Sequence, residues 1–160
     1  MKETLSKAFC ANENGKTTIT LNGEQIEGEW VEGYYVCLNG EEHRIYAGYA
    51  ETDCGEYYPK WHKIIPETIC HFTGLTDKNS KKIYTDCIIE TITLDDNSKR
   101  LALVGIGECI DGDGEPCFGV WVQRGETKGI FYKSYSSDIE VIGNIYENPK
   151  LLAEGGDKNG

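Results

Sequence analysis

Apolar and polar residues alternate over short runs along most of the chain, and turn residues separate the runs. In the first third, residues 17–21 and 24–27 flank Asn22-Gly23, and residues 34–38 and 41–46 flank Asn39-Gly40. Asn-Gly between β-prone runs favours a hairpin, because both central residues of the turn need positive φ. We expect two hairpins here, followed at residues 50–62 by an aromatic loop without a clear period.

The alternation continues after Pro66. Residues 101–110 and 117–123 form an expected hairpin across Asp111-Gly112-Asp113-Gly114, and further strands are expected at residues 68–72, 88–94, 129–133 and 140–145. One helical signal stands at the C-terminus. Asn148 suits the cap and Pro149 the first helical position, residues 150–154 propagate a helix, and Gly155-Gly156 would end it.

These runs and turns predict a mainly β fold that is rich in hairpins and has a short C-terminal helix. Nineteen glycines and only four prolines suit many tight turns. A chain of 160 residues is long enough to bury a core without disulfides. We expect an N-terminal β-hairpin region at residues 1–62 and a β core with the helix at residues 63–160, together forming one compact unit.

The formal net charge of −11 narrows the classes of partner. An acidic chain lacks the clustered Lys and Arg that bind a nucleic-acid backbone, and anionic membranes repel it. We therefore expect no direct nucleic-acid binding and no membrane binding. Ordinary solvation, a basic protein partner and mimicry of nucleic-acid phosphate are each consistent with the acidity. The sequence shows no signal-peptide run and no stretch of ~20 apolar residues, so we expect a cytoplasmic protein.

The cysteines and acidic turns offer few metal ligands. The seven cysteines are odd in number and include no CxxC pair, which favours free thiols. Cys109 and Cys117 fall opposite each other across the expected hairpin. The nearest approach to zinc spacing is Cys54, His62, Cys70 and His71, and a hairpin turn explains residues 111–115 as well as calcium would. We expect no cofactor, and whether Cys109 and Cys117 hold a metal stays open.

Catalytic patterns are weak. Nucleophilic catalysis needs a base oriented beside a Cys or Ser, and the candidate bases are His43, His62 and His71. No GxSxG elbow accompanies them, and no glycine-rich phosphate loop precedes a helix. The sequence therefore favours a protein that is not an enzyme.

Aromatic residues gather in the N-terminal half beside acidic ones. Tyr and Trp dominate interface hot spots, because they bury a large area while keeping a polar group. A plain core with Tyr hydroxyls at its rim, or an oligomer interface, would use the same residues. The candidate binding residues are Trp30, Tyr34, Tyr35, Tyr57, Tyr58 and Trp61.

Three blocks are distinctive: EWVEGYYV at residues 29–36, IPETICHFTGLTDKN at 65–79, and IEVIGNIYENPKLL at 139–152. Together they resemble the signature segments of the YopX-like family of bacteriophage and prophage proteins. Ser80 stands where that family has glycine, and Thr85-Asp86-Cys87 stands where it has Glu-Gly-Asp. We therefore expect a different turn in this chain.

The resemblance implies a mostly β fold with a small SH3-like or partly open barrel, an oligomeric protein and the cytoplasm of a bacterial host. It implies no catalytic residues. Its motif residues are expected to serve the fold, with glycines and polar residues at turns and apolar residues in the core. These residues are Phe72, Gly74, Leu75, Asp77, Asn79, Ile83, Tyr84, Gly143, Asn144, Tyr146, Asn148 and Pro149.

The leading functional hypothesis is a non-enzymatic phage accessory protein that binds a host cytoplasmic component, for host modulation or counter-defence. A second hypothesis is an oligomer that sequesters a small molecule or nucleotide. Phosphates would need cationic donors, and the scattered candidates are Arg44, Arg100, Arg124 and Lys128. An acidic DNA mimic and a metal-dependent enzyme are the remaining alternatives.

Overall fold

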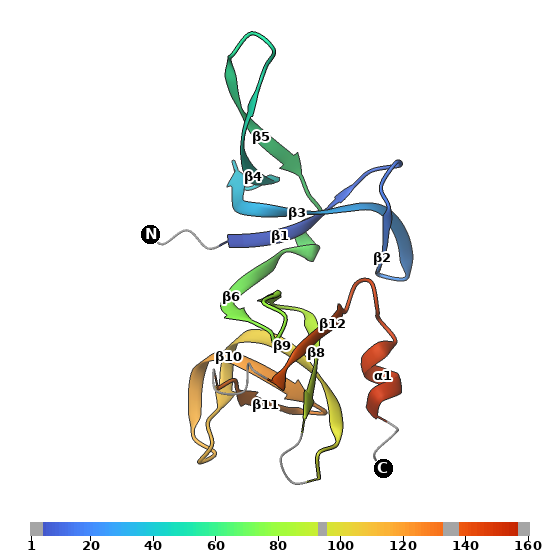
Figure 1. Ribbon diagram of the computed structural model, residues 1–160, viewed down its shortest axis with the longest axis vertical. Helices are drawn as coiled ribbons and strands as arrows, with labels where there is room; N and C mark the ends of the chain where they lie inside the picture. Colours follow the sequence, from blue (N-terminus) through green and yellow to red (C-terminus); the bar gives the residue numbers. More distant parts are fainter. Residues whose placement is uncertain (1–4, 93–95, 133–137, 157–160) are drawn as a thin grey trace. The chain divides into compact units, whose positions relative to one another are not determined.

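A computed structural model describes residues 5–92, 96–132 and 138–156. The prediction of a mainly β fold is confirmed, since 64% of the chain is strand and the one α-helix is short. The strands form two mostly antiparallel sheets (Figure 1). No closed barrel occurs among the described residues.

The chain divides into two compact units, Met1–Phe72 and Thr73–Gly160. The sequence predicts that the N-terminal region ends between residues 62 and 63, and that boundary stays a prediction. Unit 1 contains β1 (Leu5–Ala11), β2 (Thr17–Leu21), β3 (Glu24–Leu38), β4 (Glu42–Glu51), β5 (Tyr57–Lys63), the 3₁₀ helix η1 (Pro66–Thr68) and the start of β6 (Cys70–Thr76). Unit 2 contains the rest of β6, β7 (Lys82–Tyr84), β8 (Cys87–Ile92), β9 (Lys99–Ile110), β10 (Pro116–Arg124), β11 (Thr127–Ile130), β12 (Glu140–Asn144) and α1 (Leu151–Gly156).

The sheet of unit 1 is built around β3. Its first half pairs with β2 and with β1, and its last residues pair with β4. Both Asn-Gly hairpins are confirmed: φ is 52° at Asn22 and 83° at Gly23, and 54° at Asn39 and 74° at Gly40. These positive values are what a tight hairpin turn requires, so the local sequence sets the register of both hairpins.

The core of unit 1 joins β1, β3, β4 and the segment after β5. Ala8, Val31, Ile45 and Ile64 form a buried cluster. Thr68 closes one edge, because its hydroxyl accepts a hydrogen bond from the Phe9 backbone N–H at 2.9 Å. This core covers one face of β4 only, which leaves the side chains on its other face for a different role.

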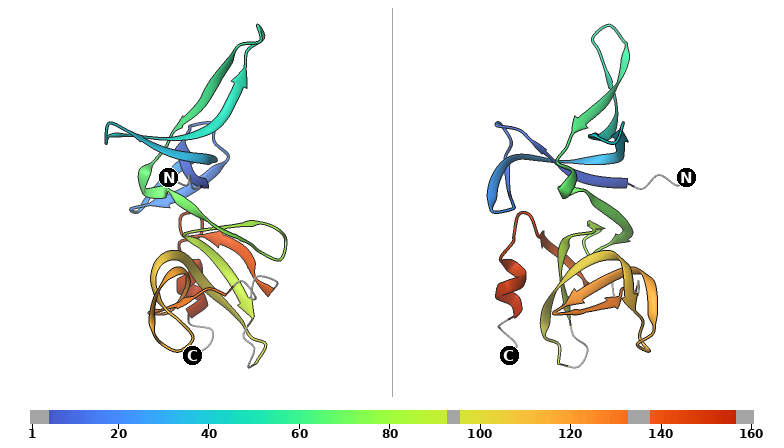
Figure 2. Two further views of the ribbon diagram at one scale, coloured as in Figure 1. Left: turned by 90° about the vertical axis from the view of Figure 1, so that its left-hand side faces the viewer. Right: turned by 180° about the vertical axis from the view of Figure 1, so that it is seen from behind.

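The expectation of an aromatic loop at residues 50–62 is wrong. Strand β4 extends to Glu51, β5 begins at Tyr57, and the two form a long hairpin that projects from the rest of unit 1 (Figures 1 and 2). The pairing of β4 with β5 shifts its register between Tyr46 and Tyr49, at a β-bulge. Residues 50–62 showed no period because β5 is exposed on both faces, with only His62 half-buried, so no buried face imposes an apolar–polar alternation there.

Unit 2 contains the second sheet, in the order β10-β11-β9-β8-β12, and also β7 and the rest of β6, which belong to the first sheet. The expected hairpin across residues 111–114 is confirmed as β9 and β10. Strand β11 pairs with β10 and also meets the end of β9 in parallel, at Gly129 and Ile110. The sheet therefore curls without closing. Its core cluster is Ile83, Cys87, Ile89, Ala102, Val104 and Ile139.

The C-terminal helix exists but begins later than expected, at Leu151. Capping by Asn148 is wrong. The Asn148 side-chain oxygen accepts a hydrogen bond from the Asn144 backbone N–H at 3.3 Å, so it stabilises the turn after β12 instead. Gly155 and Gly156 belong to the helix rather than ending it.

Candidate binding site

A row of aromatic side chains crosses three neighbouring strands of unit 1. Tyr34 on β3 is paired with Tyr46 on β4, which is paired with Trp61 on β5. The rings of Tyr46 and Trp61 lie 5.0 Å apart between centroids. Since Ile45 is buried in the core of unit 1, its chain neighbour Tyr46 points to the opposite face of the sheet. The row therefore lies on the side of the hairpin away from the core.

The row continues toward the tip of the hairpin. The bulge brings Tyr49 onto the same side as Tyr46, with ring centroids 5.7 Å apart in an edge-to-face arrangement. Pro59, opposite Tyr49, and Tyr57 follow Trp61 on the same face of β5, at two-residue spacing. We call Tyr34, Tyr46, Tyr49, Tyr57 and Trp61 the aromatic face.

The aromatic face is open to solvent. Tyr49 and Tyr57 are 68% and 69% exposed, and Tyr34 and Trp61 are each 40% exposed. A hydrogen bond with Tyr49, together with burial, raises the pKa of the Tyr46 hydroxyl to about 12. The two tyrosines thus hold each other in place. A run of exposed, mutually ordered aromatic rings is typical of an interaction surface.

Three of the six candidate residues lie on this face and three do not. Tyr34, Tyr57 and Trp61 belong to it. Tyr35 points the other way: it packs against the core of unit 1 and shares a 2.6 Å hydrogen bond with His43. Tyr58 is on the opposite face of β5 from its neighbour Tyr57.

Trp30 lies farther along β3, away from the hairpin. Its ring packs edge-on against the buried Phe9, with centroids 5.4 Å apart. The Lys7 Nζ lies 4.9 Å from the centroid of the same ring. These contacts account for Trp30 as a packing residue at the edge of the unit 1 core.

Sequence reasoning missed Tyr46 and Tyr49. They are three residues apart, so a regular strand would place them on opposite faces. Gly48 between them adopts φ 95°, and an isolated glycine inside a strand pattern is a signal for a bulge. Gly48 within a run of strand-forming residues was therefore a signal from which the bulge could have been predicted.

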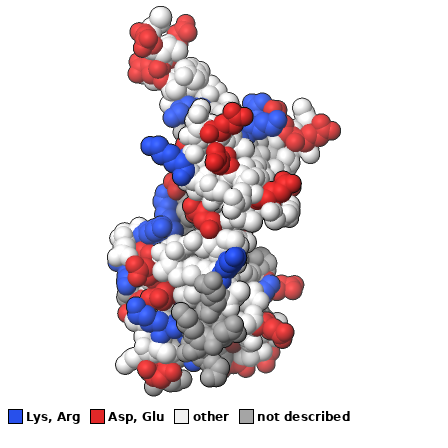
Figure 3. Space-filling view, turned by 90° about the vertical axis from the view of Figure 1, so that its right-hand side faces the viewer, with Lys and Arg blue, Asp and Glu red and all other residues white. Residues whose placement is uncertain are grey.

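The tip of the hairpin is acidic, whereas its base carries Arg44 and Lys63, a cross-strand pair on the same side as Tyr46 and Trp61. Between Arg44 and Lys60 the chain carries Glu51, Asp53 and Glu56 and no Lys or Arg. In Figure 3 the tip of the hairpin shows acidic atoms without basic ones. Aromatic rings attract cations over their faces, and nearby carboxylates strengthen that preference. The hairpin therefore suits a positively charged ligand.

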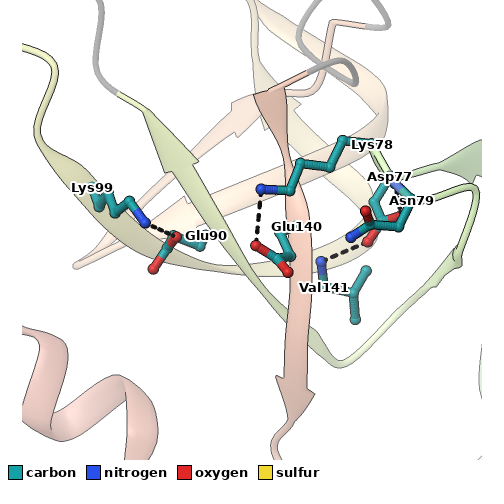
Figure 4. Close-up of polar contacts among 7 residues, drawn as sticks. All are labelled: Asp77, Lys78, Asn79, Glu90, Lys99, Glu140 and Val141. Atoms are coloured by element: carbon teal, nitrogen blue, oxygen red, sulfur yellow. Dashed lines mark hydrogen bonds and ion pairs between the residues drawn. The ribbon is translucent and has the colours of Figure 1, made fainter.

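Asp77, from the YopX-like motif, organises the start of unit 2. Its Oδ1 accepts backbone N–H bonds from Asn79 at 2.8 Å and Lys81 at 2.9 Å, and its Oδ2 accepts one from Val141 at 2.9 Å (Figure 4). Burial opposes ionisation of this carboxyl, but the bonds from Val141, Lys81 and Asn79 outweigh it and lower the pKa. Lys78 adds an ion pair with Glu140 at 3.0 Å. Asp77 therefore ties a turn to β12.

The motif block at residues 139–152 contains a similar arrangement at the end of β12, in which one side chain accepts several backbone hydrogen bonds. We call the arrangements around Asp77 and Asn144 the motif hubs. The Asn144 side-chain oxygen accepts bonds from the backbone N–H groups of Tyr146 and Glu147, at 2.9 and 2.8 Å. The Tyr146 hydroxyl donates to Asp86 at 2.9 Å. A Cβ at Gly143 would lie 2.2 Å from the Asn148 side-chain oxygen, so a larger residue there would displace that oxygen from its bond to the Asn144 N–H.

Four further motif residues also occupy structural positions. Ile83 and Tyr84 are buried, Leu75 packs against the core of unit 2, and Gly74 adopts φ 85°. The two departures from the motif, Ser80 and Asp86, adopt φ 62° and 65°. Both residues therefore adopt a positive φ, which glycine adopts most readily, and the different turn stays a prediction.

Contacts at His71, and between Cys109 and Cys117, involve the candidate catalytic and metal-binding residues. The His71 ring nitrogen lies 3.1 Å from the Ser6 hydroxyl, but Ser6 is 1% exposed, which closes it to a substrate. No group of three His, Cys, Asp or Glu side chains suited to a metal occurs in the described part of the chain. Cys109 and Cys117 are neighbours, with their sulfurs 3.2 Å apart. No helix among the described residues is long and apolar enough to cross a membrane.

A separate pocket of about 300 Å³ lies in unit 2. Its wall combines apolar side chains from β10 and the segment after β11 with two charged residues, Arg124 and Asp138. The Arg124 guanidinium donates a hydrogen bond to the Thr91 hydroxyl. Partial burial, and the nearby charge of Arg100, lower the pKa of Arg124. Of the four expected cations, only Arg124 lines this pocket.

The chain was compared with known proteins. A protein of known structure that it is similar to is protein EF1440 from Enterococcus faecalis, at 17% identity and a TM-score of 0.49, over 95% of this chain and 99% of that one. No curated protein matches the chain. The family model described as YopX protein matches residues 24–153, which include the aromatic face and both motif hubs. The chain therefore belongs to the YopX protein family.

Proposed function

We propose that this protein is a non-enzymatic, phage-encoded accessory protein that binds a basic host protein through the aromatic face of the β4–β5 hairpin. The observation that carries the proposal is a set of five aromatic residues, four of them exposed and Tyr46 half-buried, on one face of a projecting hairpin with an acidic tip. Membership in the YopX family, which is associated with phages, supports an origin in a phage or prophage and a role in the bacterial cytoplasm. Host modulation and counter-defence are both consistent with such binding.

The partner's chemistry follows from the hairpin. Exposed Tyr and Trp rings bury a large area at little entropic cost, and their faces attract Lys and Arg. Glu51, Asp53 and Glu56 supply negative charge on the same hairpin. A partner segment rich in Lys and Arg satisfies both features, whereas a purely apolar segment can only pack on the rings and an acidic segment is repelled by the carboxylates.

The test compares two adjacent tyrosines. Tyr57→Ala removes a ring from the aromatic face, and Tyr58→Ala removes one from the other face of the same strand. Bacterial proteins are captured on wild type and on each variant, identified by mass spectrometry, and titrated individually by calorimetry. We expect a basic protein whose affinity falls about thirtyfold for Tyr57→Ala, as at a hot spot, and little for Tyr58→Ala.

Equal loss of binding in both variants, or no captured protein that distinguishes them, would refute the proposal. Binding must also weaken as salt rises, because the attraction is partly electrostatic. The aromatic face would serve a different purpose if light scattering shows that wild type is a homo-oligomer and Tyr57→Ala is a monomer. In that outcome a second copy of the chain, rather than a basic protein, occupies the face.

The pocket beside Arg124 supports a second candidate, an anionic small-molecule binder. A guanidinium beside an apolar wall suits a ligand with a phosphate or carboxylate and an aromatic part. Thermal-shift measurements with a nucleotide panel test this, since a ligand at 100 times its Kd adds about 2.7 kcal/mol of stability. The thermal shift should vanish in Arg124→Ala and persist in Arg44→Ala. Arg44 is the control because it lies in unit 1, away from the pocket, and pairs there with Glu42. No shift with wild type would exclude this candidate.

A further inference from the structure

Two cysteines of unit 2 face each other across the β9–β10 hairpin. Cys109 and Cys117 are directly paired in the register, and their sulfur atoms share a contact of 3.2 Å. Cys109 is 7% exposed and Cys117 is half-buried. Among the described residues no third metal-ligating group joins them. A pair of thiols without further ligands points to thiol chemistry rather than to a structural zinc site.

The backbone at this pair suits a disulfide. The Asp111 N–H bonds to the Glu115 carbonyl at 2.9 Å, so residues 111 and 115 are a hydrogen-bonded pair. Hydrogen-bonded and non-hydrogen-bonded pairs alternate along an antiparallel ladder, which makes Cys109 and Cys117 a hydrogen-bonded pair as well. Such pairs have Cα atoms ~5.5 Å apart, within the usual range for a disulfide. The bond shortens the sulfur–sulfur distance from 3.2 Å to about 2.05 Å, through side-chain rotation and a small approach of the two Cβ atoms.

A reagent has access to the pair. Both cysteines border an open depression of about 750 Å³, which is also lined by the exposed Phe118 and by Lys128. The hydrogen bond with Cys109, together with burial and the charge of Asp111, raises the pKa of the Cys117 thiol to about 11. Glu108 and Glu126 also line the depression. Little thiolate is therefore present at neutral pH, and the reaction is slow.

We propose that Cys109 and Cys117 form a reversible disulfide site that reacts with low-molecular-weight disulfides such as glutathione disulfide. The Cys117 thiolate attacks one sulfur of the reagent, forms a mixed disulfide and releases one glutathione thiol. Cys109 then loses its proton and attacks the Cys117 sulfur, which releases the second glutathione. The protein loses two hydrogen atoms and the reagent gains them, so atoms and electrons balance.

The consequence is a covalent link between β9 and β10 beside the depression. Closing a loop in the unfolded chain favours the folded state, provided that the native geometry is not strained. Reduction returns the hairpin to its dithiol form. This site lies in unit 2 and does not depend on the aromatic face, so its test is independent of the proposed function.

The test incubates purified full-length protein with a glutathione redox buffer until the reaction stops. We expect four of the seven thiols to disappear: Cys37 and Cys54 each gain one glutathione, and a peptide two hydrogen atoms lighter than its dithiol form links Cys109 to Cys117. Dithiothreitol should restore all four thiols. The urea midpoint should rise in the oxidised form and fall again on reduction. This measurement uses wild type, so it does not depend on how a cysteine variant folds.

The thiols Cys37 and Cys54 serve as internal controls, because they are more exposed than Cys109 and Cys117, and Cys37 is paired with His43 rather than with a cysteine. They should form glutathione adducts. The proposal is overturned if Cys109 and Cys117 stay reduced, or each carries glutathione, while these two react. In Cys117→Ser, Cys109 should stay a free thiol; glutathione on Cys109 in that variant would contradict the order of steps.

Discussion

Replacing Asp77 by asparagine tests the idea that the motif serves the fold. The side chain is 6% exposed and its two oxygens accept three backbone N–H bonds, from Asn79, Lys81 and Val141. An asparagine of the same shape has one oxygen. If that oxygen keeps the bonds to Asn79 and Lys81, its NH₂ group faces the Val141 N–H, and a buried donor loses its acceptor.

Hydrogen bonds to a charged group contribute about 1.5–3 kcal/mol each, and an unsatisfied buried donor costs about 1–3 kcal/mol. We therefore expect Asp77→Asn to reduce the free energy of unfolding by about 2–4 kcal/mol. Urea denaturation followed by circular dichroism measures this, with the m-value unchanged. The matched control is Asp96→Asn, an exposed aspartate that accepts a bond from the Ser98 N–H and should cost much less.

The pH dependence supplies a second readout. The pKa of Asp77 is lowered in the folded state, below its ordinary value of 3.8. A carboxyl whose pKa is lower in the folded state than in the unfolded state stabilises the fold. This contribution is complete above the pKa of the unfolded state and is lost as pH falls through the pKa of the folded state. The difference between wild type and Asp77→Asn should therefore shrink as pH falls below 3.8. A constant difference, or a variant as stable as Asp96→Asn, would refute the reasoning.

Three further outcomes follow from named contacts. Gly33→Ala should cost about 2–3 kcal/mol, because its Cβ would lie 2.2 Å from the Tyr46 carbonyl oxygen, whereas Gly129→Ala, with no atom within 4 Å, should be nearly neutral in urea denaturation. Tyr49→Phe should lower the pKa of Tyr46 from about 12 toward 10, seen as an earlier rise in phenolate absorbance; an unchanged titration would contradict the hydrogen bond. Ser80→Gly should raise stability by about 0.5–1 kcal/mol, since φ is 62° there; a loss on thermal unfolding would contradict this.

Some elements could be predicted from the sequence because their signals are local. The Asn22-Gly23 and Asn39-Gly40 turns carry their positive φ in the residues themselves, and the β9–β10 hairpin follows from its acidic glycine turn. The cysteine pair was likewise predictable, since a short hairpin places Cys109 opposite Cys117 once its turn is known.

Other elements were missed because their cause is not local. Asn148 has the chemistry of a helix cap, yet its oxygen bonds to Asn144, a partner that exists only after β12 has formed. The bulge between Tyr46 and Tyr49 was missed because its effect depends on pairing with β5. In each case a competing partner elsewhere in the fold outweighed the local preference.

The sequence by itself determined the β class, the hairpin turns, the acidity and the family. Each of these depends only on which residues are present and on their local order. Only the tertiary structure decided which aromatic residues share a face. Cross-strand pairing and the bulge at Gly48 bring Tyr34, Tyr46, Tyr49, Tyr57 and Trp61 together and send Tyr35 and Tyr58 elsewhere. The physical reason is that the side a strand residue faces depends on its register with its neighbours, and one inserted residue reverses that side.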